Sequence, residues 1–357
     1  MSITLPPVIH IVRRFGCVGG MESYVWNLPH ELTKLGLQIG VICEETFGEF
    51  DPSIDIYKVP KPKPRPRWKS MQRFRHHVTR CVTDRLNKQP SLIHSHERSD
   101  CHHLTTFHGP PITDNKSFFS QLLISRRVAA WKQMEKDELL SASTGQILAV
   151  SSIVKNQLLE LYPELAGKGI SVAHPGIQPS PNDEHEPSRY AHPPRKFIFV
   201  GKEWKRKGLD LAVKILEQLP KQATIDVYGP TIGEVPNWLI NHECVNIMGW
   251  NERIPWGEYE VLIHPARKEP FGMVVAEARL HGVKVLTSTA VGSVEFGFKD
   301  LVALETRAPI TDWVQALESL TVNCNSRVSE CLWTWSDLAR LHVDKFYPTA
   351  FKALKNE

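Results

Sequence analysis

Two glutamates, Glu269 and Glu277, lie eight positions apart in the stretch KEPFGMVVAEARLHG, with an apolar run between them. At about 100° per residue, eight steps on a continuous helix leave the two side chains roughly 80° apart. They would not share a face, so a joint role in binding requires Glu269 to lie at or before the helix start. In the alternative interpretation, Glu269 only caps the helix and Glu277 faces solvent.

Two glycine-containing loops have residue types that suit an anionic ligand. Gly201, Lys202 and Lys207 in VGKEWKRKG place a tight turn and cations just before a predicted helix, where free N–H groups and positive charge can bind a diphosphate. A solvated basic loop is the alternative. Gly19 and Gly20 in RRFGCVGGMESY predict a turn at which the backbone can approach a ligand closely.

The stretch HSHERSDCHHLTTFHG (94–109) is dense in histidine. His94 and His96 alternate as on a strand, so both could face one side and a metal site is conceivable. The carboxylate and cysteine spacing of zinc signatures is missing, and we therefore expect no metal site. His108 differs from the others because it ends a predicted strand, where a parallel sheet presents side chains to a ligand.

Short apolar runs followed by helical patterns recur along the chain, which predicts parallel sheets built from βαβ units. Strands are predicted at 8–12, 38–43, 92–95, 104–107 and 147–151, and again at 197–201, 224–229, 245–249, 261–266 and 283–288. Helices are predicted between them, with a kink or a broken first turn at Pro29. The Pro-, Ser- and charge-rich segment 179–196 predicts a linker, and Ser336 is the expected N-cap of a last helix.

The segment Lys58 to Arg80 carries nine Lys or Arg residues and no acid. Prolines at 60, 62, 64 and 66 prevent a helix there. From Ser70 onward a helix is predicted, with Met71, Phe74 and Val78 on one side. Such a segment suits an anionic membrane surface or nucleic acid, or is only a solvated face.

Composition narrows the class of protein. A length of 357 residues predicts two domains. The sequence contains no run of eighteen apolar residues, so no membrane-spanning helix is predicted. The first residues lack the layout of a secretory signal, and seven cysteines without a C-x-x-C pair indicate a reducing cytosol. The dinucleotide fingerprint and the P-loop pattern are absent, which argues against a nicotinamide dehydrogenase or a P-loop NTPase.

Together these residues resemble the retaining glycosyltransferases of family 4, and most closely the lipopolysaccharide-core hexosyltransferases. The resemblance spans nearly the whole chain. It is carried by the E-x7-E pair Glu269 and Glu277, the basic G-K/R-x-x-x-x-K-G element at Gly201, Lys202, Lys207 and Gly208, the glycine-rich first loop, TTFHG and VAHPGI.

The resemblance implies the α/β fold called GT-B, in which two Rossmann-like parallel-sheet domains face a deep cleft. Residues 1–178 would form the acceptor-side domain and residues 197–339 the donor-binding domain. The C-terminal helix, at about 340–357, would cross back to pack on the first domain.

The family also implies roles for individual residues. The residues expected to act on the donor sugar or the leaving diphosphate are His108, Glu269 and Lys207. Those expected to bind the sugar nucleotide are Gly19, Gly20, Gly201, Lys202, Lys207, Phe271, Gly272, Met273, Val274, Glu277 and Met248. Position 202 is lysine, where arginine is commoner in the family. Lysine lacks the bidentate guanidinium group of arginine but keeps the positive charge.

The implied activity is transfer of a hexose from a UDP-sugar, with retention, to a saccharide acceptor that is lipid-linked or belongs to the lipopolysaccharide core. No D-x-D motif occurs in the chain, so we expect no metal and no other cofactor. The enzyme would be cytoplasmic, held at the inner face of the cytoplasmic membrane by the segment Lys58 to Arg80, and would not bind nucleic acid. The alternative is a non-catalytic protein of the same fold that binds a sugar nucleotide or a glycan.

Overall fold

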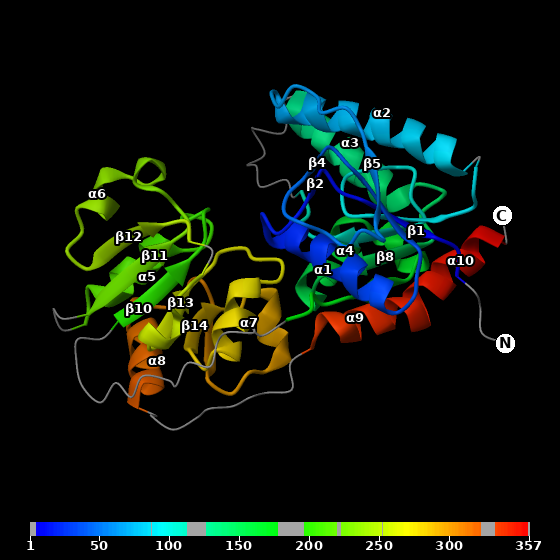
Figure 1. Cartoon of the computed structure of the whole chain (residues 1–357). Coiled ribbons are helices and arrows are strands. Elements are labelled where there is room, and N and C mark those ends of the chain that lie inside the picture. The colour runs from blue at the N-terminus through cyan, green and yellow to red at the C-terminus, as the bar shows by residue number, and fades with distance from the viewer. Residues whose placement is uncertain are drawn as a thin grey trace. The chain divides into compact units, whose positions relative to one another are not determined.

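The structure is a computed structural model that describes residues 5–86, 88–112, 126–177, 196–219, 223–251, 253–322 and 333–355. The chain divides into two compact units (Figure 1). The first unit joins Met1–Gly176 to Trp333–Glu357, and the second is Ile177–Leu332. The predicted linker, 179–196, lies outside the described residues except for Lys196, which begins a strand.

The first unit is built on a seven-stranded parallel sheet in the order β5-β3-β1-β6-β7-β8-β9. The strands are β1 (Val8–Ile11), β3 (Ile39–Cys43), β5 (Asp55–Lys58), β6 (Leu92–Ser95), β7 (Leu104–Phe107), β8 (Gln146–Ala149) and β9 (Ile170–Val172). Two short strands, β2 (Arg14–Phe15) and β4 (Glu45–Thr46), pair beside it. The five strands predicted here are present, whereas the edge strands β5 and β9 were not predicted.

The helices of the first unit are α1 (Gly20–Lys34), α2 (Arg67–Leu86), α3 (Arg126–Leu140), α4 (Ser152–Leu161), the short η2 (Pro163–Gly167), α9 (Trp335–Leu341), the π-helical η6 (His342–Phe346) and α10 (Tyr347–Lys355). Helix α1 is continuous through Pro29, so of the two expectations, a kink or a broken first turn, the break is not found. Helix α2 begins at Arg67, before the predicted Ser70, and buries Met71, Phe74 and Val78 as predicted.

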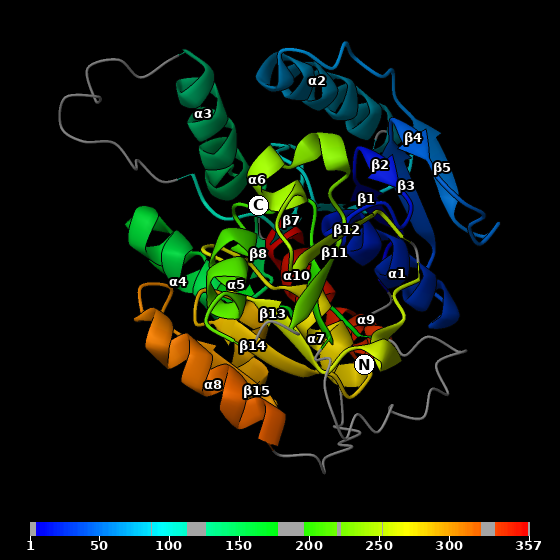
Figure 2. The ribbon, with the colours of Figure 1, turned by 90° about the vertical axis from the view of Figure 1, so that its left-hand side faces the viewer.

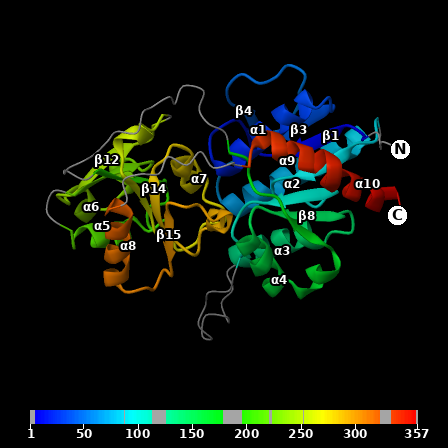
Figure 3. The same cartoon turned by 90° about the horizontal axis from the view of Figure 1, so that it is seen from below.

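The last helices belong to the first unit, as Figure 3 shows for α9 beside α1. Trp333 donates its indole N–H to the carbonyl of His174 at 3.0 Å, which fixes the returning chain. The N-cap of α9 is Thr334, and its hydroxyl and the carboxylate of Asp337 form a capping box. The predicted return of the C-terminal helix is confirmed, but the predicted N-cap, Ser336, is wrong because the helix begins two residues earlier, at Trp335.

The second unit is a six-stranded parallel sheet in the order β12-β11-β10-β13-β14-β15. Its strands are β10 (Lys196–Val200), β11 (Thr224–Tyr228), β12 (Val245–Gly249), β13 (Val261–His264), β14 (Lys284–Ser288) and β15 (Leu301–Leu304). Its helices are α5 (Leu209–Leu216), α6 (Asn237–Ile240), α7 (Met273–Leu280) and α8 (Ile310–Val322), with short turns η3 (Ile232–Glu234), η4 (Trp256–Glu258) and η5 (Gly292–Phe296).

Helices cover both faces of this sheet (Figure 2). Phe197 and Phe199 on β10 pack into a core shared with α5 and α8, whereas Ile198 between them packs into the core beside α7. This alternation follows from the two-residue period of a strand. Because both faces are covered, the strands are continuous apolar runs, and polar groups collect at their carboxyl ends. No helix in the described residues has the length and apolar character needed to span a membrane.

The start of α7 depends on a glycine. Gly272, its N-cap, has φ 88°, and an added Cβ would meet Val291 Cγ1 at 2.6 Å. We expect Gly272→Ala to lower the free energy of unfolding by about 2–5 kcal/mol, from backbone strain plus overpacking. Gly282 has φ 74° with open space around it, so the control Gly282→Ala loses only the strain, about 1–2 kcal/mol.

Urea denaturation of both variants measures the difference. Equal losses in Gly272→Ala and Gly282→Ala would show that the contact with Val291 does not constrain the loop.

Candidate active site

The loop between β13 and α7 holds Glu269 apart from the helix. The backbone N–H of Glu269 donates to the carbonyl of Ala290, and its carbonyl accepts from Gly292, at 3.1 Å each. Helix α7 begins at Met273 with Gly272 as N-cap. Glu269 therefore lies before the helix and does not cap it, which removes the capping alternative.

The side chain of Glu269 meets two cations from the loop after β10. Its Oε2 lies 2.8 Å from Lys207 Nζ and 3.2 Å from Arg206 Nη1. The Arg206 guanidinium also bonds to Glu203 and to the carbonyl of Lys268. Two motifs that are about 60 residues apart in the sequence thus form one partly buried ion cluster, which we call the Glu269 cluster: Glu269, Lys207 and Arg206.

Electrostatics keep Glu269 ionised. Burial alone would raise the pKa of its carboxyl, but His264 at 3.8 Å and the charges of Lys207 and Arg206 hold that pKa well below its usual range. Burial lowers the pKa of His264 to about 4, so its ring is neutral. A carboxylate accepts hydrogen bonds and donates none. Glu269 can therefore bind hydroxyl groups but cannot serve as a general acid near neutral pH.

Beside this cluster lies the first turn of α7. The backbone N–H groups of Met273 and Val274 have no hydrogen-bond partner among the described residues, as expected for a helix N-terminus. Phe271 is buried and anchors the turn. Glu277 is half-buried one turn further on, and burial raises the pKa of its carboxyl against the opposing influence of His281 and Lys207.

Two glycines allow the loop after β10 to approach Glu269 closely. An added Cβ on Gly201 would meet Lys207 Cδ at 2.1 Å, and one on Gly208 would meet the carbonyl oxygen of Pro265 at 2.1 Å. Gly201 thus leaves the space through which Lys207 extends toward Glu269. Lys202 is not brought to the cluster, because its exposed side chain forms an ion pair with Glu234 at 3.0 Å.

The remaining predicted residues lie elsewhere. Met248 is exposed on the edge strand β12 of the second unit. Gly19 and Gly20 begin α1 in the first unit, and His108 follows β7 there. His108 and Glu269 belong to different units.

His108 lies in an aromatic and imidazole environment. Its Nε2 is 3.0 Å from His96 Nδ1, and the Tyr24 ring meets it edge-on at 4.7 Å between centroids. Burial lowers the pKa of His108 to about 3. The imidazole is therefore neutral at physiological pH and can offer one donor and one acceptor nitrogen.

Sequence reasoning missed three residues that contact these groups. Arg206 lies in the predicted basic loop and His264 within the predicted strand 261–266, and neither is assigned a role from the sequence. His10 joins His94 and His96 in a buried group whose ring nitrogens lie within 4.8 Å of one another. Arg206 could have been found because it is the neighbour of Lys207 in the sequence. His264 could have been found because it lies at the carboxyl end of a strand.

Residues 18–181 match the family model described as Glycosyltransferase Family 4, and residues 194–323 match the one described as Glycosyl transferases group 1. A curated protein of Klebsiella pneumoniae, an uncharacterized 41.2 kDa protein in the cps region, is 33% identical over 97 residues. That match spans only 26% of this chain and 27% of the Klebsiella protein.

Two solved structures share the fold over almost their whole length. WaaG, a glycosyltransferase involved in lipopolysaccharide biosynthesis, has a TM-score of 0.72 at 16% identity, covering 98% of this chain and 99% of WaaG. HepE from Anabaena, in complex with UDP and glucose, has a TM-score of 0.56 at 14% identity, covering 98% and 99%.

The fold is thus the two-domain, parallel-sheet GT-B fold of glycosyltransferases. The two family models together span most of the described residues in both units. Both parts of the chain therefore match glycosyltransferase models: residues 18–181 match Glycosyltransferase Family 4, and residues 194–323 match Glycosyl transferases group 1.

The buried histidines predict acid sensitivity. An unfolded histidine has a pKa of about 6.5, whereas burial holds that of His108 at about 3, so below pH 6.5 protons bind the unfolded chain first. Each such histidine lowers the free energy of unfolding by about 2 kcal/mol between pH 7 and pH 5. Urea denaturation at both pH values should show this loss.

The variant His108→Gln should lose about 2 kcal/mol of that pH dependence, because it removes one such group. His76→Gln, at an exposed position of α2, is the matched control and should leave the dependence as it is in the wild type. An unchanged pH dependence in His108→Gln would contradict the burial of a neutral imidazole.

Proposed function

We propose that the chain transfers a hexose from a UDP-sugar to a saccharide acceptor with retention of the anomeric configuration. The observation that carries the proposal is the Glu269 cluster beside the free N–H groups of α7, which combines an acceptor for sugar hydroxyls with donors and cations for a diphosphate. UDP as the nucleotide is supported by HepE, whose structure holds UDP and glucose. An acceptor in the lipopolysaccharide core, or a related lipid-linked glycan, is supported by the likeness to WaaG.

In this mechanism the residues of the second unit bind the donor. Glu269 accepts hydrogen bonds from hydroxyls of the sugar, and Glu277 accepts them from the ribose. The N–H groups of Met273 and Val274, with Lys207 and Arg206, bind the diphosphate. These groups stabilise the negative charge that develops on the diphosphate oxygen as its bond to the anomeric carbon breaks.

The acceptor oxygen attacks the same face of the anomeric carbon that the diphosphate leaves. Its proton passes to the leaving diphosphate oxygen, so no protein carboxylate acts as nucleophile. His108 contacts the donor sugar as a neutral imidazole. The reaction needs no divalent cation in this proposal, because the chain lacks a D-x-D motif and Lys207 and Arg206 supply positive charge.

Turnover separates this proposal from a non-catalytic sugar-nucleotide or glycan-binding protein of the same fold. Across a panel of UDP-, GDP- and ADP-sugars with core oligosaccharide as acceptor, we expect UDP release that persists in excess EDTA. Lys207→Met should lower kcat/KM by about 100-fold or more, as expected for loss of a transition-state charge contact. The control Lys214→Met removes an exposed lysine of α5 and should act as wild type.

Binding of UDP-sugars without release of UDP would favour the non-catalytic alternative. Loss of activity in EDTA that returns with Mg²⁺ would contradict metal independence.

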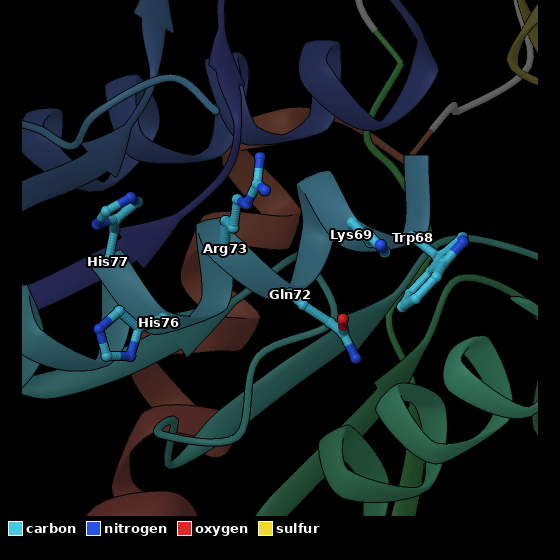
Figure 4. A pocket seen from close by; sticks show the side chains of 6 residues that line it. All are labelled: Trp68, Lys69, Gln72, Arg73, His76 and His77. Atoms are coloured by element: carbon cyan, nitrogen blue, oxygen red, sulfur yellow. The ribbon is translucent and has the colours of Figure 1, made fainter. Parts of the chain in front are cut away.

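We further propose that α2 and the preceding segment hold the enzyme at the anionic inner face of the cytoplasmic membrane. Eight cations from Lys58 to Arg80 are exposed: Lys58, Lys61, Lys63, Arg65, Arg67, Lys69, Arg73 and Arg80. A surface hollow of about 550 Å³ on α2 is lined by Trp68, Lys69, Gln72, Arg73, His76 and His77 (Figure 4). Cations beside a half-buried tryptophan suit the headgroup region of a bilayer.

Arg75 does not belong to this surface. Its guanidinium pairs with Asp100 and Asp137 at 2.8 Å each, and its side chain is only 11% exposed. Its charge is therefore used within the unit.

Vesicle sedimentation tests the membrane surface. Neutralising Arg65, Arg67, Lys69 and Arg73 to glutamine should weaken partitioning onto phosphatidylglycerol-containing vesicles by at least about 100-fold, since each cation contributes about 1 kcal/mol. The matched control neutralises four exposed cations of the second unit, Lys214, Arg253, Lys299 and Arg307. If both variants partition like the wild type, the basic segment is only a solvated face.

A further inference from the structure

A continuous run of buried polar groups in the first unit links the C-terminal helix to His108. We call it the histidine chain, and its members in spatial order are Thr106, His94, Tyr347, His10, His96 and His108. The three contacts between ring nitrogens or from ring to threonine are short: 3.0 Å for His10–His96, 3.0 Å for His96–His108 and 2.8 Å for His94–Thr106. The Tyr347 hydroxyl connects the two inner histidines, because it lies 3.3 Å from His94 Nδ1 and 3.5 Å from His10 Nε2.

The parallel sheet brings the histidines together. His10 on β1 and His94 on β6 are paired in register, so their side chains stand side by side on one face. His96, two residues after His94, stays on that face and reaches His108 after β7. The rings of His10, His94 and His96 are all buried, so their nitrogens must find partners within the protein.

A widened turn in the C-terminal helix supplies the hydroxyl. In η6 the N–H of Tyr347 bonds to the carbonyl of His342, five residues back. On an α-helix, residues five apart would point about 140° away from each other. The π-helical turn instead lets both side chains reach His94, with ring centroids at 5.5 Å for His342 and 5.9 Å for Tyr347. Such turns are frequent at functional sites.

Direct bonds between imidazoles couple their tautomers. A neutral imidazole carries one N–H donor and one bare acceptor nitrogen, so a ring that accepts on one side must donate on the other. In His10, His96 and His108 all the bonds must therefore run in one direction. Nδ1 of His108 bonds to none of the described residues, and the direction of the chain decides whether it is an acceptor or a donor.

We propose that Tyr347 is a positioning residue that sets, through His10 and His96, which ring nitrogen of His108 carries the proton. The Tyr347 hydroxyl is closer to His94, and we assign its proton to that bond. The hydroxyl then accepts from His10 Nε2, and every bond runs away from His108. His108 holds its proton on Nε2 and presents a bare Nδ1, and on the proposed function that nitrogen accepts a hydrogen bond from a donor-sugar hydroxyl.

A metal ion is the competing occupant of this place, since three histidines lie together. Yet Nδ1 of His10 and Nε2 of His96 face each other at hydrogen-bond distance, and a shared proton already satisfies both. A metal ion would need both nitrogens bare. The histidine chain and a bound metal therefore exclude each other, and elemental analysis of the purified protein distinguishes them.

The variant Tyr347→Phe removes one hydroxyl and keeps the ring. It leaves the N–H of His10 Nε2 without an acceptor, and a buried orphan N–H is less tolerated than a bare acceptor. The tautomers of His10, His96 and His108 should then reverse, and His108 should carry its proton on Nδ1. The matched control is Tyr57→Phe, which removes a tyrosine hydroxyl that, among the described residues, bonds to the exposed Asp55.

The full chain is labelled with ¹⁵N-histidine, and two-bond ¹H–¹⁵N spectra report the tautomer of each imidazole. The signals of His108 are assigned as those missing in His108→Gln. We expect the Nε2–H form of His108 in the wild type and in Tyr57→Phe, and the Nδ1–H form in Tyr347→Phe.

Kinetics add the second readout. In Tyr347→Phe we expect kcat to fall about 10-fold with the donor KM changed less than about 3-fold, because donor binding rests on the second unit. A His108 tautomer that is the same in Tyr347→Phe and wild type overturns the proposal, as does a stoichiometric metal bound by the histidines. A reversed tautomer with unchanged kcat overturns the positioning role. If the protein turns over no sugar nucleotide, the proposed function fails. The spectra still show whether Tyr347 sets the tautomer of His108 through the histidine chain.

Discussion

The ion cluster of Glu269 with Lys207 and Arg206 is the interaction on which the second unit's chemistry depends. A carboxylate that is only 11% exposed is costly to ionise unless cations compensate it, and here two lie within 3.2 Å. The cluster forms only because Gly201, Gly208 and Gly272 leave room for side chains and carbonyls that a Cβ would displace. The same charges that stabilise Glu269 are the ones a diphosphate would need.

Burial sets protonation states in both units, by opposite routes. In the second unit, charge compensation keeps Glu269 ionised despite its burial. In the first unit, the histidines are neutral because burial lowers their pKa, and they bond to one another in place of water. One unit therefore offers fixed charge and the other a neutral hydrogen-bonding imidazole.

Much of the fold was predictable because buried parallel strands are short apolar runs, as in 104–107 and 261–266. The edge strands β5 and β9 were missed because partial exposure breaks that pattern. The meeting of Lys207 with Glu269 followed from their positions at carboxyl ends of strands. Side-chain partners were not predictable in this way: Lys202 pairs with Glu234, and Tyr347 reaches the histidines only through a widened helical turn.

The central claim is that Glu269 binds the sugar while the cations bind the diphosphate. Calorimetric affinities of wild type and Glu269→Gln for UDP and for the UDP-sugar donor test it directly, because the two ligands differ only by the sugar. The account predicts that Glu269→Gln weakens the UDP-sugar by at least about 10-fold, the loss expected for a charged hydrogen bond, and does not weaken UDP. Equal weakening of both ligands, or of neither, would contradict it.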